Sequence, residues 1–518
     1  MTSTPKYIQE SAIPYEIQEE SPAEAQKRAE YRQRLAEKLK DPEFRKIEGF
    51  PLGTDEDILA LSDPPYYTAC PNPFLPELLE QWREERRVTR RDLNLSDDEN
   101  FPVGFRTYRR EPFAADVSEG KNDPIYNAHS YHTKVPHRAI MRYILHYTDP
   151  GDIVFDGFCG TGMTGVAAQL CGDKKTVESL GYRVDHKGII YDGEKAISRL
   201  GPRKAILNDL SPAASFIAYN YNTPVEVRAF EREAKRILGE VEKECGWMYK
   251  TWHPNATDAQ RVKGSINYTV WSDVFRCPQC GREMVFWDVA VELTTKAIHE
   301  SWNCPACGTL LAKTPKKDMG AQKVQRVMDT IYDRALGSTL RKARQVPVLI
   351  NYSVDKKRYE KRPDDEDLAL IRQIEESEIP YPFPTNKVPK GDKTSDPFNL
   401  GITHVHHFYT RRSLNFITSL LNKLKDPQNE RVNKALLFLI QSLSLGYTKL
   451  NRYGATHYSQ VNRILSGTLY VSSLLSEVSP DYAFAGKTKL SGKHYLTRKG
   501  VTVRWSPFLR LSIALPDL

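Results

Sequence analysis

Residues 151–172 read GDIVFDGFCGTGMTGVAAQLCG, and this stretch decides the fold class. Residues 153–155 (Ile-Val-Phe) form a short apolar run that is typical of a buried parallel strand. Glycines follow at positions 157, 160 and 162. Small residues then begin a helix that ends near Gly172. A strand, a glycine loop and a helix in this order let the backbone approach a ligand at the carboxyl end of the strand. The stretch therefore predicts an α/β domain with a ligand site at this loop.

The spacing of the glycines points to a class of ligand. It is not the G-x-G-x-x-G pattern of dinucleotide-binding loops, and no Gly-Lys-Ser/Thr follows, as it would in a P-loop. Asp156 ends the predicted strand, and residues 158–162 read F-x-G-x-G. These residues resemble motif I of the S-adenosylmethionine-dependent methyltransferases. That cofactor has no phosphates, and its amino-acid end and ribose need a carboxylate and close backbone groups. The alternative is an ordinary tight turn between a strand and a helix.

A second acidic residue follows another short apolar run. Residues 205–207 (Ala-Ile-Leu) predict a strand, and Asn208-Asp209 comes directly after it. In doubly wound folds an acidic residue at the end of the next strand binds ribose hydroxyls. The polar residues 173–200 between the two runs predict an exposed insertion, which explains the long spacing. The alternative is that Asp209 caps the helix predicted from Pro212.

Residues 62–67 read Ser-Asp-Pro-Pro-Tyr-Tyr and follow the apolar run 58–61, which we interpret as a strand end. Two consecutive prolines make a rigid loop with few backbone donors. The Asp63 carboxylate and the Pro64 carbonyl can then accept hydrogen bonds from one amino group, while the Tyr66 ring stacks on a flipped base. The tetrapeptide resembles motif IV of the nucleic-acid methyltransferases that act on N6 of adenine or N4 of cytosine. The alternative is a chance turn.

Residues 129–152 read HSYHTKVPHRAIMRYILHYTDPGD and lead into the glycine stretch. A turn containing Lys134 and Pro136 precedes a predicted helix. This segment resembles motif X, which precedes motif I in such enzymes and packs over the methionine end of the cofactor. The alternative, which also holds in part, is a helix with an apolar stripe. Its members lie at helical spacing: Ile140, Tyr143, Ile144 and Tyr147.

Two C-P-x-C-G knuckles occupy residues 277–281 and 304–308. Each glycine allows a tight turn, and four thiolates in two knuckles make a closed tetrahedral zinc site of the structural kind. A redox pair would need one C-x-x-C only. The predicted ligands are Cys277, Cys280, Cys304 and Cys307. Residues 284–293 (MVFWDVAVEL) predict a strand, as in a zinc ribbon. We expect the aromatic residues nearby to pack the small domain, with base stacking as the alternative: Trp271, Phe275, Trp287 and Trp302.

Composition excludes several classes of protein. The chain has 518 residues, a net charge of +8 and a mean hydropathy of −0.55. No stretch approaches the ~20 apolar residues needed to cross a bilayer, and the first twenty residues lack the pattern of a secretory signal. Eight cysteines in a chain of this length do not indicate a disulfide framework. We therefore expect a cytoplasmic protein of several domains, and the mildly basic charge is compatible with a nucleic-acid partner.

The chain reads as a methyltransferase core interrupted by a zinc ribbon. Its predicted parts are a charged helical extension (1–50), a methyltransferase core (51–260), a zinc ribbon (261–320), a helical segment (321–352), a polar linker (353–397), a helical region (398–478) and a basic, poorly patterned C-terminus (479–518). The predicted fold class is α/β: a doubly wound Rossmann-like core with an inserted zinc ribbon and a helical C-terminal region.

Together these motifs resemble the zinc-ribbon-containing DNA methylases, over roughly residues 50–470. The resemblance implies transfer of a methyl group from S-adenosylmethionine to a base amine in double-stranded DNA, with N6 of adenine as the expected acceptor. It implies catalytic roles for Asp63, Pro64, Pro65 and Tyr66. It implies cofactor contacts from Lys134, Pro136, Asp156, Gly157, Phe158, Gly160, Thr161, Gly162 and Asp209. It is also compatible with partner subunits of a restriction-modification or defence system.

Two features of the sequence differ from the pattern of that family. Its members commonly carry an Asp-Pro-Pro-aromatic motif after the ribbon, and residues 308–518 contain none, which suggests a chain that is shortened or altered at its C-terminus. About 60 residues separate Tyr66 from the segment that begins at His129 and contains Lys134, which is short for the remaining strands of a catalytic sheet. Two alternatives accompany the DNA methyltransferase: an RNA base methyltransferase with the same core, and a truncated, inactive protein that binds nucleic acid through its ribbon and its basic end.

Overall fold

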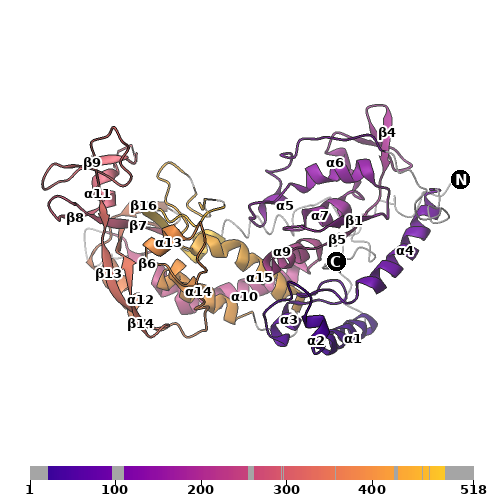
Figure 1. The fold of residues 1–518 in the computed structure, drawn as a ribbon, viewed down its shortest axis with the longest axis horizontal. Coiled ribbons are helices and arrows are strands. Elements are labelled where there is room, and N and C mark those ends of the chain that lie inside the picture. The colour runs from indigo at the N-terminus through magenta and orange to yellow at the C-terminus, as the bar shows by residue number, and fades with distance from the viewer. Residues whose placement is uncertain are drawn as a thin grey trace. The chain divides into compact units, whose positions relative to one another are not determined.

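The computed structural model describes residues 22–95, 110–254 and 262–484, apart from residues 293, 296, 356, 425–429, 458, 462 and 466. It divides into two compact units (Figure 1). The first holds the described residues up to Phe230, and the second holds those from Glu231 onward. Most of the predicted basic C-terminus (479–518) and the start of the predicted N-terminal extension lie outside the described residues. No described helix is both long and apolar enough to cross a membrane.

Four helices begin the first unit: α1 (Pro22–Leu39), α2 (Pro42–Arg45), α3 (Asp55–Leu61) and α4 (Leu75–Asp92) (Figure 1). The predicted N-terminal helix is confirmed, and it also contributes to a core: Leu35 and Leu39 are fully buried in a cluster with Ile58 and Phe74. The strand interpreted at 58–61 is wrong, because these residues end helix α3. Thr54 and Asp57 form a capping box, and acidic residues fill the first turn, which favours a helix.

The glycine stretch forms the predicted strand, loop and helix. β1 (Ile153–Asp156) pairs in parallel with β5 (Lys204–Leu207), and α7 (Met163–Leu170) follows the loop. Helices α6 (His137–Tyr147) and α9 (Pro212–Asn222) pack against α7. Trp82 of α4 packs with Ile153 and Ile206, one from each strand. In the described part of the chain this parallel sheet has two strands. The fold is therefore mixed α/β, and the Rossmann-like core remains a prediction.

Residues 173–200 are more ordered than the predicted exposed insertion. They form α8 (Lys174–Glu178) and an antiparallel sheet of β2 (Arg183–Val184), β3 (Ile189–Asp192) and β4 (Lys195–Arg199). The predicted Asp-Gly-Glu turn joins β3 to β4, with Gly193 at a φ of +59°. Val177 and Ile190 are fully buried, so this segment also contributes buried apolar side chains.

A long strand, β7 (Lys263–Arg276), organises the second unit (Figure 1). It pairs in antiparallel fashion with β6 (Lys250–Trp252), β8 (Glu283–Val285), β12 (Gln325–Arg326), β15 (Gln345–Val354) and β17 (Leu474–Val478). β16 (Lys357–Lys361) extends this sheet beyond β15. A hairpin joins β13 (Met328–Asp333) to β14 (Ser338–Ala343). A three-stranded sheet contains β9 (Ser301–Asn303), β10 (Leu310–Ala312) and β11 (Gln322–Lys323).

The remaining elements are helical. The short ones are α5 (Pro124–Asn127), α11 (Phe286–Ala290), α13 (Ser395–Asn399), and the 3-10 helices η2 (Gly246–Tyr249), η4 (Val405–Phe408) and η5 (Leu445–Tyr447). The longer ones are α10 (Val227–Cys245), α12 (Asp365–Glu376), α14 (Arg411–Asn422) and α15 (Glu430–Ser444). The two helices predicted within 398–478 are confirmed as α14 and α15, and β17 ends that region.

Three expectations for the second unit are corrected. The predicted helical segment 321–352 forms strands, because apolar residues alternate along β15: Val348, Ile350 and Tyr352 are buried, and Pro347 could not sit inside a helix. The predicted linker 353–397 instead contains β16 and α12, and a capping box stabilises the start of α12. The strand predicted at 284–293 is short, since β8 ends at Val285 and α11 follows.

Candidate active site and metal centre

The glycine loop, which connects β1 to α7, contains two glycines with a positive backbone φ. Gly160 has a φ of +52° and Gly162 a φ of +71°, values that favour glycine. A Cβ on Gly162 would lie 2.6 Å from the Cβ of Ala218 in α9, so this glycine also lets α9 approach closely. A Cβ on Gly160 would meet nothing nearer than Tyr131, at 3.5 Å. The two glycines therefore differ: Gly162 is required for the packing of α9, and Gly160 is required mainly for its positive φ.

Asp156 and Asp209 hold this loop from two strand ends. Asp156 accepts hydrogen bonds from the Phe158 N–H (3.2 Å) and the Thr164 hydroxyl (2.5 Å). Asp209 accepts one from the Gly160 N–H through Oδ2 (2.9 Å) and one from the Ser211 N–H through Oδ1 (2.9 Å). The structure thus brings together the two acidic residues that the sequence predicted. A carboxylate accepts about four hydrogen bonds, so each retains capacity for a ligand.

The alternative reading of Asp209 as a helix cap is only half right. Ser211 is the N-cap of α9, and its side chain accepts from the Ala214 N–H. Asp209 instead bonds the Ser211 backbone just before the helix and reaches back to the glycine loop. Its carboxylate therefore stabilises the junction between the loop and α9.

The surface of the loop carries exposed apolar side chains. Phe158 is 83% exposed, Leu210 is 72% exposed and Phe155 is 61% exposed, although Phe155 belongs to a strand. Thr161 in the same loop is 1% exposed, and its hydroxyl has no hydrogen-bond partner among the described residues. Exposed rings and a buried, unsatisfied hydroxyl in this part of the chain suit a ligand that has both an aromatic part and polar groups.

The motif X segment begins α6 as expected, with Pro136 at its N-cap. Lys134 turns back on its own loop, where its ammonium bonds the carbonyls of Tyr126 and His129 and lies 4.2 Å from the Tyr126 ring centre. The helix shows the alternative reading as well. Ile144 is buried, and the Tyr143 hydroxyl bonds the backbone of Ala115. Lys134 therefore orders the turn in this structure.

The Asp-Pro-Pro-Tyr loop follows α3 and folds into a tight turn. Asp63 and Tyr67 exchange two backbone hydrogen bonds, and Asn72 donates its side-chain N–H to the Pro65 carbonyl at 2.9 Å. Pro64 and Pro65 are buried, while Asp63 and Tyr66 are half-buried. Both prolines thus anchor the turn, and the two polar members stay near its surface.

Asp63 forms a hydrogen bond with Tyr219, a residue that no sequence motif indicated. The Tyr219 hydroxyl donates a hydrogen bond to Oδ2 of Asp63 at 2.9 Å, and Oδ1 lies 3.8 Å from the Arg28 guanidinium. The Tyr219 ring also stacks on Tyr67, with the centres 4.5 Å apart. Tyr219 lies in the middle of α9, ten residues after Asp209, in a segment that reads only as a buried helix.

The four knuckle cysteines lie close enough together to hold one metal ion. The Sγ atoms of Cys277 and Cys307 are 3.7 Å apart, and those of Cys280 and Cys304 are 3.6 Å apart. A zinc tetrahedron with Zn–S bonds of about 2.3 Å places its sulfurs about 3.8 Å apart, whereas a disulfide needs about 2.05 Å. Sulfurs in the knuckles therefore already have the spacing of zinc ligands.

The two knuckles share one backbone pattern. Gly281 and Gly308 have φ of +73° and +72°, and each donates its N–H to the carbonyl of the first cysteine. The aromatic residues around them pack together as expected: Phe275, Trp287 and Trp302 are buried, and Trp271 donates its indole N–H to Glu477. Packing is thus their role in this structure.

A second cluster of metal-ligand types was missed by the sequence analysis. His406 and His407 of η4 point their Nε2 atoms at Oδ2 of Asp333, at 3.0 and 2.7 Å. The Nδ1 atom of His407 accepts backbone N–H groups from Thr403 and His404, so its proton belongs on Nε2. A metal at that Nε2 would need the opposite tautomer. The arrangement therefore favours a hydrogen-bonded network over a metal site, and the signal that could have found it is the run His404-Val-His-His.

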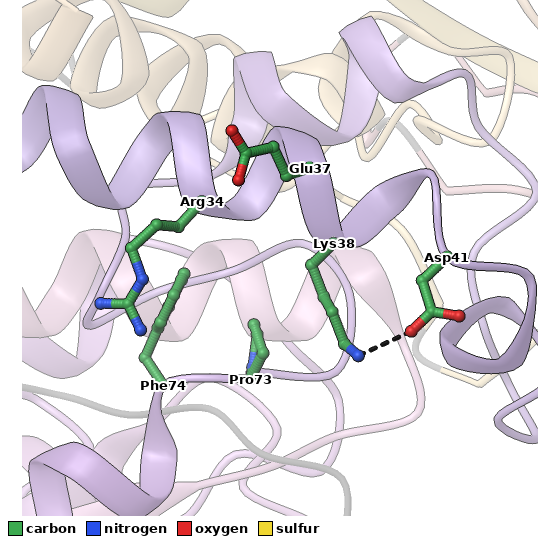
Figure 2. Close-up of a pocket in the computed structure, with 6 residues that line it drawn as sticks. All are labelled: Arg34, Glu37, Lys38, Asp41, Pro73 and Phe74. Atoms are coloured by element: carbon green, nitrogen blue, oxygen red, sulfur yellow. Dashed lines mark hydrogen bonds and ion pairs between the residues drawn. The ribbon is translucent and has the colours of Figure 1, made fainter.

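Figure 2 shows an open hollow between α1 and the turn that follows the Asp-Pro-Pro-Tyr loop. Its charged groups are largely engaged. Lys38 pairs with Asp41 at 2.7 Å, and Arg34 pairs with Glu77 and lies over the Phe74 ring. No residue of the glycine loop lines this hollow. It is therefore separate from the candidate cofactor site.

A family model matches one part of the chain. Residues 71–200 match the N6/N4 methyltransferase family model, described as DNA methylase. The matched range contains the motif X segment and the glycine loop, so this part of the chain is similar to a DNA methylase domain. The enzyme activity of this class is methylation of DNA at adenine N6 or cytosine N4. Searches of curated proteins and of solved structures gave no match.

Proposed function

We propose that this protein transfers a methyl group from S-adenosylmethionine to N6 of adenine in double-stranded DNA, on a Rossmann-like core. The observation that carries the proposal is that the DNA methylase match coincides with a loop where two strand-end carboxylates, Asp156 and Asp209, converge. A glycine loop without phosphate ligands, flanked by two acids, has the groups that a cofactor with an ammonium and a ribose requires.

The residues around the loop fit that cofactor. The buried Thr161 hydroxyl lacks a partner that a cofactor oxygen could provide. The exposed Phe158 ring offers a stacking face for the adenine of the cofactor. The residues that would hold the cofactor are Lys134, Pro136, Asp156, Gly157, Phe158, Gly160, Thr161, Gly162 and Asp209.

S-adenosylmethionine supplies an electrophilic methyl group on a sulfonium ion. The protein's part is to present the target amine in line with that methyl group. Asp63 and the Pro64 carbonyl accept the two amine hydrogens, Pro65 keeps the turn rigid, and Tyr66 stacks on the flipped base. Asp63 need not be a strong base, because the amine proton becomes acidic only after the methyl group has transferred. Positioning and electrostatics supply most of the rate.

The cysteine knuckles hold a structural zinc ion in this proposal. Four thiolates close the coordination shell, so the ion has no open position for chemistry. Its role is to fold the ribbon of β8 to β10 by joining the two knuckles. Partner subunits of a modification or defence system, and a cytoplasmic location, are compatible with this function.

The test is methyl transfer from labelled S-adenosylmethionine by the full chain. The substrates are unmethylated double-stranded DNA and RNA of matched sequence, and nucleoside analysis identifies the modified base. We expect N6-methyladenine in DNA only, and loss of at least about a hundredfold in rate for Asp63→Ala. Asp192→Ala, an exposed acid in the β3–β4 turn, is the matched control.

Three results would contradict the proposal in different ways. Wild-type activity in Asp63→Ala would remove Asp63 from the site. Methylation of RNA alone would reassign the substrate. Salt-sensitive DNA binding without any cofactor binding would favour the non-catalytic nucleic-acid-binding protein.

A further inference from the structure

Helix α9 connects the two halves of the candidate active site. It begins where Asp209 bonds the glycine loop, and Ala218 packs against Gly162. Near its end, Asn222 donates its side-chain N–H to the Gly162 carbonyl at 3.0 Å. Between these points, Tyr219 reaches Asp63, which is 156 residues away in the chain. One rigid helix therefore contacts both the cofactor loop and the Asp-Pro-Pro-Tyr turn.

The hydrogen bond from Tyr219 makes the two oxygens of the Asp63 carboxylate different from each other. Oδ2 accepts the buried Tyr219 hydroxyl at 2.9 Å. Oδ1 has only the long 3.8 Å contact with Arg28 among the described residues. A donor that is 1% exposed is not replaced by water, so it fixes the rotation of the carboxylate. Oδ1 is then the oxygen that remains available to a substrate amine.

The Tyr219 ring has its own support, which does not depend on the hydroxyl. It stacks on Tyr67 at 4.5 Å with an interplanar angle of 17°. Tyr67 in turn exchanges backbone hydrogen bonds with Asp63. Removing the hydroxyl alone should therefore leave the helix, the stack and the turn in place.

We propose that Tyr219 is a positioning residue, which aims Oδ1 of Asp63 at the target amine and links its position to the cofactor loop through α9. This inference rests on the proposed function. It also explains how an Asp-Pro-Pro-Tyr turn that follows a helix can be held at a fixed distance from the cofactor. Tyr219 contacts neither the substrate nor the cofactor in this assignment.

The experiment compares Tyr219→Phe with Tyr191→Phe in the full chain. Tyr191 is the matched control, because its hydroxyl also contacts an aspartate, Asp185 at 3.4 Å, but in the β2–β4 sheet. For Tyr219→Phe we expect kcat to fall about ten- to a hundredfold, the effect of losing a hydrogen bond to a charged group, while KM and Kd for S-adenosylmethionine stay within about twofold. Tyr191→Phe should match the wild type.

A double-mutant cycle separates positioning from a structural role. If Tyr219 acts through Asp63, Tyr219→Phe should cost less than about twofold in the Asp63→Ala background, measured on the residual rate at high enzyme concentration. A similar loss in both backgrounds, a matching loss of cofactor affinity, or a Tyr219→Phe variant as active as Tyr191→Phe would overturn the inference. Failure of the proposed function would look different, since the wild type would then transfer no methyl group or Asp63→Ala would be fully active.

Discussion

The backbone N–H of Gly160 donates a hydrogen bond to Oδ2 of Asp209 at 2.9 Å, although the two residues follow different strands, β1 and β5. The bond closes the glycine loop onto the start of α9, and the same carboxylate accepts the Ser211 N–H through Oδ1. Asp209 therefore has a structural role in the loop as well as the proposed contact with the cofactor ribose. Substitutions can separate these two roles.

Asp209→Asn should separate them. The asparagine oxygen can still accept the Gly160 N–H, so the loop should keep its shape, but the bond from the Ser211 N–H and the charge offered to the ribose hydroxyls are lost. We expect S-adenosylmethionine to bind about tenfold more weakly, with only a small loss of thermal stability from the missing Ser211 bond. Asp209→Ala should lose both functions and bind at least about a hundredfold more weakly. Calorimetric titration with the cofactor, alongside thermal unfolding, measures both effects.

The control for this pair is Asp192→Asn, a substitution at an exposed acid of the β3–β4 turn, which should change neither quantity. Equal cofactor affinity in the wild type and in Asp209→Ala would show that this carboxylate serves the loop alone.

The cysteine knuckles should bind one zinc ion per chain. Metal analysis of the purified protein should give one equivalent, and cobalt substitution should give the absorption bands of a tetrahedral thiolate site. Cys277→Ser should lower the zinc content and unfold the ribbon, because Cys277 is buried and its backbone bonds Arg282. Strong chelators should have the same effect on the wild type.

His407→Gln is the informative control for zinc content. The tautomer of His407 argues against a metal at Asp333, so this variant should retain one equivalent of zinc. Two equivalents in the wild type and one in His407→Gln would show instead that the histidine cluster binds a second ion.

Sequence patterns identified the features that depend on neighbours in the chain. The strand and loop around Asp156, the two cysteine knuckles, and the helices α14 and α15 are all local patterns, and all were found. Tyr219 and the His406–Asp333 contact arise from tertiary packing, which spacing does not encode. The helical segment expected at 321–352 was wrong, because its many charged residues suggested a charged helix. The alternation of β13 and β14, together with the positive φ of Gly337, was the better signal.

The same limit applies to the turn at Asp63. The run Ile58–Leu61 is apolar enough for a strand, and the resemblance to motif IV favoured that interpretation. Thr54 and the three acidic residues between it and Ile58 form the start of a helix, and this capping signal decides the local structure. The resemblance to motif IV therefore misled the assignment of this one element, and the catalytic roles that it implies stay a prediction.

A buried ion pair should dominate the stability of the second unit. Arg412 and Glu477 are 4% and 3% exposed at their side chains and contact each other directly. Arg412 also donates to the Met248 carbonyl and the Thr269 hydroxyl, while Trp271 donates to Glu477. Arg412→Met leaves the Glu477 charge buried without its partner, which should cost about 3–5 kcal/mol of unfolding free energy. Urea denaturation followed by tryptophan fluorescence measures this loss.

The comparison variant is Arg236→Met. Arg236 also pairs with carboxylates, at 2.7 Å from Glu240, but both side chains are more than 40% exposed. Its loss should cost less than about 1 kcal/mol. A loss of similar size in both variants would mean that Glu477 is stabilised by Thr410 and Trp271 without the arginine.

Acid should weaken the contact between η4 and the tip of the β13–β14 hairpin in two steps. Burial lowers the pKa of His407 to about 4, below the ordinary 6.5, even though Asp333 favours its charged form. In the unfolded chain this imidazole binds a proton below about pH 6.5, so stability should fall as the pH drops from 6.5 to 4. Burial alone would raise the pKa of Asp333, but hydrogen bonds from both histidines lower it to about 2 from 3.8. Its contribution should be lost between about pH 4 and 2.

Denaturation midpoints measured from pH 7.5 to 3 test this order. His407→Gln should remove the decline between pH 6.5 and 4 and leave the one at lower pH. His457→Gln, at an exposed histidine outside the cluster, should follow the wild type throughout. Protonation of His407 would also break the hydrogen bonds that its Nδ1 atom accepts from the Thr403 and His404 N–H groups. As the wild-type midpoint falls, the amide hydrogens of these two residues should therefore exchange faster. A wild-type midpoint that stays constant from pH 6.5 to 4 would contradict a neutral, buried His407.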